Sequence, residues 1–425
     1  MGHRAWIGID FGTSGCRVCA IDVSGHVIIQ EQQAFPASQH STLSPEQQSN
    51  VLFDVLNRLI QQLSGWTIES ICIDATSGSV MLCDTEGQPL SDMMMYHDQR
   101  AIDAARKIAS VAPPESAARG VSSGLAKFIH LQQTLKWPQS CLLVHQADWL
   151  TIQLGGQPGI TDYNNALKSG YDVQNLQWPE WIQAVTTTKV LPKVVPPGTV
   201  IGQCAASVMQ RLGIKQAMPP TLKAGTTDSL AAFIATGANQ TGEAITSLGS
   251  TLVLKLLCEH PIFDAERGIY SHKLGNRWLA GGASNTGGAV LSHFFNQDQL
   301  MTLSQQIDLT QPTLDYYPLL RPGERFPIAD PAYPPRLQPR PTEDHLFLYG
   351  LLTGIARIEK AGYECLQQLG ETSVKSIRTV GGGARNPVWT TIRQSLLKVP
   401  FTSARQTEAA YGSALLAKDG LKFFE

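Results

Sequence analysis

Residues 6–15 read Trp6-Ile7-Gly8-Ile9-Asp10-Phe11-Gly12-Thr13-Ser14-Gly15. The apolar start of this stretch predicts a buried strand, and residues 17–21 predict a second strand after the glycine-rich turn. The turn of such a hairpin can present several backbone N–H groups to an anion, above all to phosphate. Gly12, Thr13 and Ser14 are therefore candidate phosphate-binding residues, and Asp10 is placed to hold Mg²⁺ through water. An ordinary hairpin with turn-forming residues is the alternative interpretation of this turn alone.

The composition excludes several classes of protein. The chain has 425 residues, is 43% hydrophobic and 16% charged, and carries a net charge of −2. This length predicts two or three domains with full hydrophobic cores. Without a basic run, nucleic acid and anionic membranes are not expected partners, and no apolar stretch reaches the roughly 18 residues of a membrane span. Few cysteines and an immediate first strand predict a cytoplasmic chain without disulfides or signal peptide.

The first part of the chain predicts a mixed sheet. A third strand is expected at residues 27–30, and a helix follows with Ser44 as N-cap, Pro45 at its first position, Gln47 completing a capping box, and its end at Gly65. Strands are expected next at residues 70–74 and 80–84. This β-β-β-α-β order is typical of a mixed sheet covered by helices.

Residues 92–172 are interpreted as an inserted region that faces a ligand. Its polar clusters are His97-Asp98-Gln99-Arg100 and Thr161-Asp162-Tyr163-Asn164-Asn165-Ala166. Asn, Asp and Thr side chains in loops can orient a hydroxylated ligand. They are also the commonest turn formers, so both interpretations stay open.

The second half of the chain repeats the opening pattern. Residues 222–233 predict a strand end, a tight glycine turn and a helix that begins close to Asp228, where the helix dipole favours an acid. Two strands at 244–248 and 252–256 then flank Gly249-Ser250-Thr251, a second hairpin turn without the aspartate. The repeat predicts two related halves, each with a phosphate-binding turn.

The remaining segments are predicted to be a connector, a glycine patch, one long loop and helices. Residues 192–203 are expected to form an extended connector, and the glycine patch 281–288 leads into a helix. Residues 311–341 are rich in proline and include Gly323-Glu324-Arg325-Phe326-Pro327. A loop of this length is usually functional or covers a surface. A helix is expected at 345–369, and a last one at 408–416.

A strand at 377–380 ends in Gly381-Gly382-Gly383-Ala384-Arg385-Asn386-Pro387. Three successive glycines let a flat group lie against bare backbone. Trp389 is near enough in the chain to cover such a group, and Asn386 can hydrogen-bond it. These residues are therefore candidates for holding a purine.

Common catalytic motifs are missing. The chain contains no Gly-Lys pair, so it has no Walker loop, and the protein-kinase and dinucleotide motifs are also absent. Residues 120–124 fit the nucleophile-elbow pattern but lack the buried strand that must precede it. Cys16 and Cys19 form a C-x-x-C pair, but the sequence has no second pair of this kind to complete a zinc site. Both are therefore expected to be core residues. The remaining set of two phosphate turns, a purine site and two carboxylates suits phosphoryl transfer.

In these residues the chain resembles the FGGY carbohydrate kinases, from Ile7 to about Lys418. The resemblance is carried by five stretches in the family's order: residues 10–15, 224–228, 248–251, 381–386 and 408–414. The short length and residues 73–78, 281–288 and 323–331 are similar to the D-ribulose kinases of cyanobacteria and plants, often labelled xylulose kinases. The chain departs at Tyr96, two residues before Asp98, where many family sugar sites carry Trp.

The resemblance implies an α/β fold of two RNase H-like domains, of the actin/Hsp70/hexokinase type, flanking a nucleotide cleft. Residues 1–235, rejoined by 408–425, would form the sugar-binding domain, and 236–407 the nucleotide-binding domain. It further implies ATP and Mg²⁺, and a monomer or homodimer. Domain closure would exclude water from the reaction.

The resemblance also assigns roles to residues. Asp228 would be the catalytic base, Asp10 would position Mg²⁺, and both would contact metal and sugar. The ATP-binding set is Gly12, Thr13, Ser14, Gly249, Ser250, Thr251, Gly287, Gly382, Gly383, Asn386 and Trp389. The sugar-binding set adds Thr13, Ser77, Asp98 and Arg100.

Two alternatives remain from the sequence. The substrate could be D-ribulose, xylulose, L-ribulose or a polyol, because a few hydroxyl contacts decide between them. A non-catalytic ATP switch of the actin or chaperone kind would share the two phosphate turns. Such a switch would lack the aspartate after the Ala224-Gly225 turn and the loops at 96–100 and 161–166.

Overall fold

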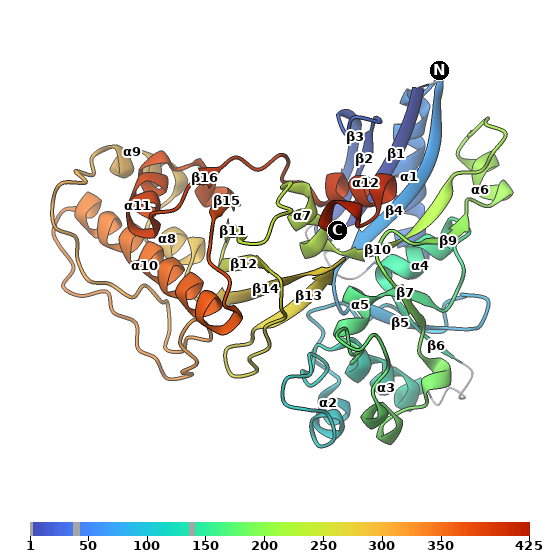
Figure 1. Ribbon diagram of the computed structural model, residues 1–425, viewed down its shortest axis with the longest axis horizontal. Coiled ribbons are helices and arrows are strands. Elements are labelled where there is room, and N and C mark those ends of the chain that lie inside the picture. Colours follow the sequence, from blue (N-terminus) through green and yellow to red (C-terminus); the bar gives the residue numbers. More distant parts are fainter. Residues whose placement is uncertain (1–2, 37–42, 136–140) are drawn as a thin grey trace. The chain divides into compact units, whose positions relative to one another are not determined.

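The structure is a computed structural model that describes residues 3–36, 43–135 and 141–425. The chain forms two compact units, Met1–Gly237 with Arg405–Glu425, and Ala238–Ala404. The boundaries expected from the sequence, after residues 235 and 407, fall close to these. Each unit is a mixed α/β layer structure built on one six-stranded sheet (Figure 1).

The sheet of the first unit has the strand order β3-β2-β1-β4-β10-β9. The predicted opening hairpin forms its centre, since β1 pairs antiparallel with β2 and parallel with β4, which in turn is parallel to β10. Three parallel strands therefore end at one edge of the sheet. The strands are β1 (His3–Phe11), β2 (Gly15–Ile21), β3 (Val27–Ala34), β4 (Trp66–Ala75), β9 (Val200–Gln203) and β10 (Thr221–Thr227).

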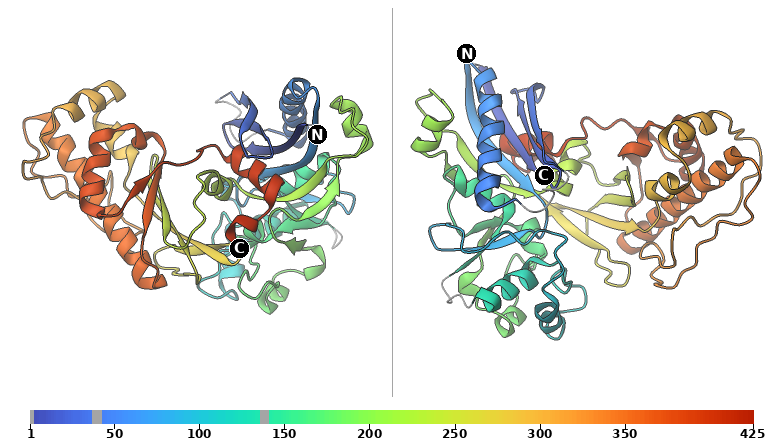
Figure 2. Two further views of the ribbon diagram at one scale, coloured as in Figure 1. Left: turned by 45° about the horizontal axis from the view of Figure 1, so that its top comes forward. Right: turned by 180° about the vertical axis from the view of Figure 1, so that it is seen from behind.

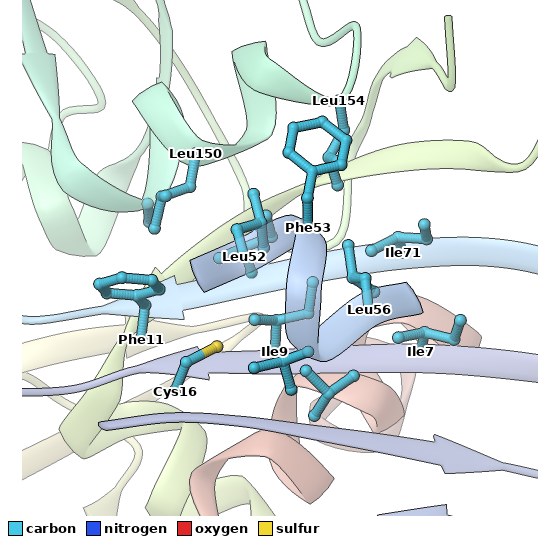
Figure 3. Close-up of a cluster of buried hydrophobic side chains, with 14 of the residues drawn as sticks. Ile7, Ile9, Phe11, Cys16, Leu52, Phe53, Leu56, Ile71, Leu150 and Leu154 are labelled. Atoms are coloured by element: carbon cyan, nitrogen blue, oxygen red, sulfur yellow. The ribbon is translucent and has the colours of Figure 1, made fainter. Parts of the chain in front are cut away.

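The core of the first unit lies between this sheet and two helices, α1 (Pro45–Gln62) and α4 (Gln146–Gln153). Figure 3 shows Ile7 and Ile9 of β1 beneath Leu52 and Leu56 of α1. The capping box predicted at Ser44 is confirmed: its hydroxyl accepts from the Gln47 backbone, and the Gln47 side chain accepts from the Ser44 backbone. The α1 helix is capped at Leu63, two residues before the glycine expected to end it.

The opposite face of the sheet is covered by α7 (Asp228–Ala235) and α12 (Ala409–Asp419), as the two views of Figure 2 show. Ser70 donates a hydrogen bond from β4 to the carbonyl of Ala417, at 2.6 Å. Ser413 of α12 donates to the carboxylate of Asp74 in β4, at 2.5 Å. The last helix of the chain is thus fixed directly behind the ends of the central strands.

The remaining elements of the first unit surround the strand ends. They are the pairs β5 (Val80–Cys83) with β6 (Leu142–His145) and β7 (Ile160–Asp162) with β8 (Lys193–Val195), and the helices α2 (Ile102–Ala109), α3 (Gly124–Leu135), α5 (Tyr163–Leu167) and α6 (Ala206–Arg211). Short 3₁₀ helices lie at Glu180–Ala184, Thr188–Val190 and Lys422–Phe424. The predicted connector at 192–203 is wrong in part, because it contains two strands on either side of Pro196-Pro197-Gly198: β8 pairs with β7, and β9 pairs with β10.

The second unit has the sheet order β13-β14-β12-β11-β15-β16. Its longest helix, α10 (Asp344–Gly370), contributes more buried hydrophobic side chains to this core than any other element of the unit. The strands are β11 (Glu243–Leu248), β12 (Leu252–Cys258), β13 (Tyr270–Leu274), β14 (Arg277–Ser284), β15 (Ser376–Val380) and β16 (Phe401–Thr402). The other helices are α8 (Gly288–Phe294), α9 (Gln297–Gln305), α11 (Pro387–Leu397) and the 3₁₀ turn Gly382–Arg385.

The glycine patch at 281–288 differs from the expectation. Gly281 and Gly282 belong to strand β14, and only the later residues form the turn into α8. Gly282 is needed in the strand because the ring of Phe326 occupies the space that a side chain would fill. Among the helices of the described ranges, none is long and apolar enough to cross a membrane.

Candidate active site

The candidate site of the first unit lies where the three parallel strands end. Asp10 in β1 and Asp74 in β4 are register partners, and Thr226 in β10 is the partner of Asp74 on the other side. Because register partners in a sheet point to the same face, the two carboxylates and the hydroxyl are neighbours. Polar side chains that gather at the carboxyl ends of parallel strands mark a ligand site in open α/β sheets.

Asp10 is almost fully buried, with 6% exposure. Burial raises the pKa of its carboxyl to about 6, the charge of Arg17 acting against this rise and that of Asp228 adding to it. The Arg17 guanidinium donates to Asp10 Oδ2 at 3.2 Å. A buried carboxylate with one partly exposed cation beside it is an incompletely compensated charge, so a bound cation would be favoured here.

Asp74 is a site residue that the sequence interpretation missed. It is fully buried, and burial, followed by the charge of Asp10, raises its pKa well above the usual range. Its Oδ2 accepts from Ser413, whereas its Oδ1 has no donor among the described residues. The signal was present in the sequence, because a charged residue closing the apolar run Ile71-Cys72-Ile73 is unusual for a buried strand.

Asp228 is the first residue of α7, directly after β10. The backbone N–H of Ser229 donates to its Oδ1 at 2.6 Å. The positive end of the helix dipole stabilises a carboxylate at this position. The predicted helix start is confirmed, and it brings the carboxylate close enough to Asp10 to influence the pKa of that residue.

The β1–β2 turn lies beside these carboxylates. The N–H of Gly12 donates to Gly15 O at 3.0 Å, and Ser14 O accepts from the N–H of Phe35 at 2.8 Å, which fixes the turn at both ends. The side chains of Thr13 and Ser14 remain at least partly exposed. The turn is therefore rigid and carries accessible hydroxyl groups, as a phosphate-binding turn requires.

Two loops predicted to bind sugar lie side by side. Ser79, after the β4 strand, accepts a hydrogen bond from the N–H of Tyr96 at 2.9 Å. Lys127 of α3 is fully buried and donates to Gly78 O at 2.8 Å and to Met95 O at 2.7 Å, so it joins both loops. The hydroxyl of Ser77 is buried without a hydrogen-bond partner in the described part of the chain. This hydroxyl therefore has unused hydrogen-bonding capacity beside the two loops.

Asp98 and Arg100 contact each other. Arg100 Nη2 donates to Asp98 Oδ2 at 2.6 Å, and its Nε lies 3.1 Å from Oδ1, so the pair is bidentate. The guanidinium holds the pKa of Asp98 below its usual range. The Asp98 side chain is only 15% exposed, whereas that of Arg100 is 70% exposed. The hydrogen-bonding groups of each side chain are therefore used in part by the other.

The polar stretch 161–166 is largely engaged in local structure. Asp162 caps α5 by accepting from the N–H groups of Asn164 and Asn165, and it also accepts from the Asn165 amide at 2.6 Å. Burial and the charge of Asp148 raise its pKa to about 7. The Asn164 amide lies 3.5 Å from the hydroxyl of Thr226 at the strand ends. The turn-forming interpretation therefore holds for Asp162, whereas Asn164 reaches the site.

The second unit contains a cavity of about 1030 Å³. The predicted nucleotide residues that line it come from the β11–β12 turn and from the segment after β15: Gly249, Ser250, Gly382, Gly383, Asn386 and Trp389. Helices α8 and α9 supply much of the remaining wall, including His293, Met301 and Ser304. Thr251 and Gly287 lie next to this lining without being part of it.

Asn386 and Trp389 differ from their expected positions. The Asn386 carboxamide accepts from the N–H of Trp389, as the N-cap of α11, and donates to the Ser304 hydroxyl at 2.8 Å. Trp389 is 2% exposed, and its indole N–H donates to Leu352 O at 3.1 Å. The indole lies beneath Gly383, where a side chain at that glycine would collide with it. Trp389 thus packs against the backbone at Gly383 as a core residue, and its ring is not exposed to stack on a ligand.

The nucleophile-elbow pattern and the cysteine pair have no catalytic environment in the described part of the chain. Residues 120–124 lead into α3 from a turn, not from a buried strand. Cys16 and Cys19 are buried free thiols in β2. Within the described ranges, no cluster of three or more His, Cys, Asp or Glu residues could hold a metal ion.

The donor set at the strand ends nevertheless fits Mg²⁺. This ion keeps most of its water and is usually held by one or two carboxylates together with substrate phosphates. Asp10 and Asp228 beside a phosphate-type turn supply such a set, and the incompletely compensated charge of Asp10 favours a cation. These two residues are the ones that would hold it.

Two family models match the chain in succession. The model of the N-terminal domain of the FGGY family of carbohydrate kinases covers residues 5–235, and that of the C-terminal domain covers residues 244–418. The chain belongs to the FGGY family. It is an ATP-dependent sugar kinase with the family's two-domain, mixed α/β fold of the actin/hexokinase-like type.

Named relatives of this FGGY kinase act on several sugars. A xylulose kinase from Staphylococcus epidermidis is 22% identical over 451 residues, covering 99% of this chain and 88% of that protein. A gluconokinase from Bacillus subtilis is 22% identical over 450 residues, covering 96% of this chain and 85% of that protein.

Solved structures share the fold. The crystal structure of xylulose kinase from Rhodospirillum rubrum matches with a TM-score of 0.83 at 20% identity, covering 98% of this chain and 90% of that one. That of Plasmodium falciparum glycerol kinase with ADP has a TM-score of 0.86 at 16% identity, covering 100% and 90%.

Proposed function

We propose that this FGGY kinase transfers the γ-phosphoryl group of ATP to the terminal hydroxyl of D-ribulose, giving D-ribulose 5-phosphate. The choice of sugar rests on residues 73–78, 281–288 and 323–331, which resemble the short D-ribulose kinases. The choice of chemistry is supported by one observation: Asp10 and Asp228 lie at the ends of parallel strands of one unit, close enough for the charge of Asp228 to raise the pKa of Asp10.

In the proposed reaction, Asp228 accepts the proton of the terminal hydroxyl as its oxygen attacks the γ-phosphorus and the bond to ADP breaks. Such a base typically contributes about 10²–10⁴-fold in rate. Ser77 would bind a substrate hydroxyl, since its own Oγ lacks a protein partner in the described part of the chain. Asp98 and Arg100 would bind sugar hydroxyls from the neighbouring loop.

The phosphates of ATP would be bound by Gly12, Thr13 and Ser14 and by Gly249, Ser250 and Thr251. The purine would lie on Gly382 and Gly383 in the cavity of the second unit. Mg²⁺, when held by Asp10 and Asp228, would neutralise charge that develops on the transferred phosphoryl group. In this proposal the guanidinium of Arg17 holds the Asp10 carboxylate in place and favours its ionised form.

Xylulose is the second candidate substrate, because relatives covering nearly the whole chain are named xylulose kinases. A panel of D-ribulose, D-xylulose, L-ribulose, gluconate, glycerol and ribitol, with coupled detection of ADP, decides between them. The proposal predicts the highest kcat/KM for D-ribulose. A higher value for D-xylulose would replace the sugar and leave the kinase chemistry intact.

A further inference from the structure

One buried carboxylate fixes the long irregular segment 311–341 to the sheet of the second unit. Glu324 is 2% exposed. From its own segment it accepts from the Tyr317 hydroxyl at 3.0 Å and the Arg325 N–H at 2.9 Å. From the end of β14 it accepts from the Ser284 hydroxyl at 2.6 Å and the Asn285 N–H at 2.8 Å. Because its contacts are charge-assisted and buried, they are among the stronger hydrogen bonds of the unit.

The residues that Glu324 holds continue directly into the turn before α8. The Ser284 hydroxyl, which donates to Glu324, also accepts from the N–H of Thr286 at 3.2 Å. The Thr286 hydroxyl donates to Pro318 O at 2.6 Å, a second bond to the irregular segment. Thr286 is therefore fixed by the carboxylate, through Ser284, and by the segment that carries it.

The same turn is bonded to the β11–β12 turn that lines the cavity. Leu252 N–H donates to Thr286 O at 2.8 Å, and Gly288 N–H donates to Gly249 O at 2.8 Å. Gly287, between them, has a φ of 141°, and a side chain there would lie 2.6 Å from the Thr251 carbonyl carbon. The two turns are thus joined by backbone hydrogen bonds and packed closely at Gly287 and Thr251.

We propose that Glu324 is a positioning residue for the nucleotide. It sets the place of the Gly249–Thr251 turn through residues 284–288, although it does not line the cavity itself. The inference deepens the function proposed above and rests on it in one respect, that the Gly249–Thr251 turn binds phosphate. It assigns a role to the motif Gly323-Glu324-Arg325-Phe326-Pro327, which the reaction leaves unexplained.

The test is Glu324→Gln, which keeps the shape but places an NH₂ group opposite donors. The buried side chain then loses an acceptor oxygen and faces donors with an NH₂ group, which weakens the bonds that hold residues 284–288 in place. The KM for ATP should therefore rise about 10-fold. The Kd of ATP, measured by calorimetry without sugar, should rise equally. The KM for the sugar should change less than about twofold. Glu343→Gln, on an exposed residue before α10, is the matched control and should change none of these values.

A second variant keeps the test decisive if Glu324→Gln does not fold. Ser284→Ala removes one of the bonds between Glu324 and β14 and should raise the Kd of ATP about threefold to tenfold. If both variants fold, the effect of the double variant should be less than the two single effects combined, because both single variants disrupt the bond between Ser284 and Glu324.

Two results would overturn the inference. One is an unchanged Kd of ATP in a folded Glu324→Gln protein, and the other is an equal rise of both KM values, which a general loss of structure produces. The calorimetric readout needs no sugar. If the unmodified protein phosphorylates no sugar at all, the proposed function fails, while the comparison of ATP affinities still decides the role of Glu324.

Discussion

Among single residues, Asp228 carries the proposed proton transfer. Asp228→Asn removes the basic oxygen and keeps the side-chain volume, so kcat for sugar phosphorylation should fall by at least about 10²-fold while ATP still binds. Asp103→Asn, on a strongly exposed side chain of α2, is the control. Initial rates of ADP formation with sugar give the comparison, and near wild-type turnover would remove Asp228 from the mechanism.

Asp10 combines a functional charge with a cost in stability. Burial raises its pKa from 3.8 to about 6, so the folded protein holds this proton more tightly than the unfolded chain does. Below about pH 4 the carboxyl carries its proton in both the folded and the unfolded state, so Asp10 does not change the free energy of unfolding there. As the pH rises through 4 to 6 the folded state loses stability, on the order of 3 kcal/mol by pH 7.5.

Asp10→Asn should therefore abolish activity and yet raise the melting temperature at pH 7.5. The gain should shrink as the pH falls towards 4, and scanning calorimetry across that range measures it. A variant that is less stable than the wild type at pH 7.5 would show that the bond to Arg17 outweighs the cost of burying the carboxylate.

At the level of elements, α3 supports both sugar loops through Lys127. Burial lowers the pKa of its ammonium group to about 7. Lys127→Met takes the Lys127 donor from the carbonyl of Gly78, at about 1–3 kcal/mol, and leaves the carbonyl of Met95 with the Asp98 N–H as its donor. The KM for the sugar should rise about 10-fold with little change in the KM for ATP. Lys107→Met, exposed on α2, is the control, and an equal rise of both KM values would contradict this role.

The α11 helix supports the proposed purine site through Trp389. Trp389→Ala should lower the free energy of unfolding by about 3–5 kcal/mol, because it empties a large core site. It should also raise the KM for ATP, since Gly383 loses its support, with little effect on the KM for the sugar. Trp389→Phe fills most of the volume and should be milder on both counts. The reverse KM pattern would show that the purine lies elsewhere.

Local signals explain how much of these elements could be predicted. Neighbouring residues determine three of the predicted features, and the structure confirms them: the Ser44 capping box, the start of α7 at Asp228 and the two glycine hairpins. Asp74 and the pairing of Asp98 with Arg100 depend on burial and side-chain geometry. Glu324 contacts Ser284 across 40 positions of the chain. Such contacts leave no periodic trace in the sequence, so the turns and the helix start could be predicted, whereas the bonds that support them could not.

For the whole molecule, the central claim is that phosphate passes from ATP to a sugar and not to water. Phosphorus NMR of the unmodified protein with ATP, Mg²⁺ and D-ribulose tests it most directly. The account predicts equal amounts of ADP and a sugar 5-phosphate, with almost no inorganic phosphate, and negligible ATP turnover without sugar. ADP and inorganic phosphate released at the same rate with or without any sugar would contradict it.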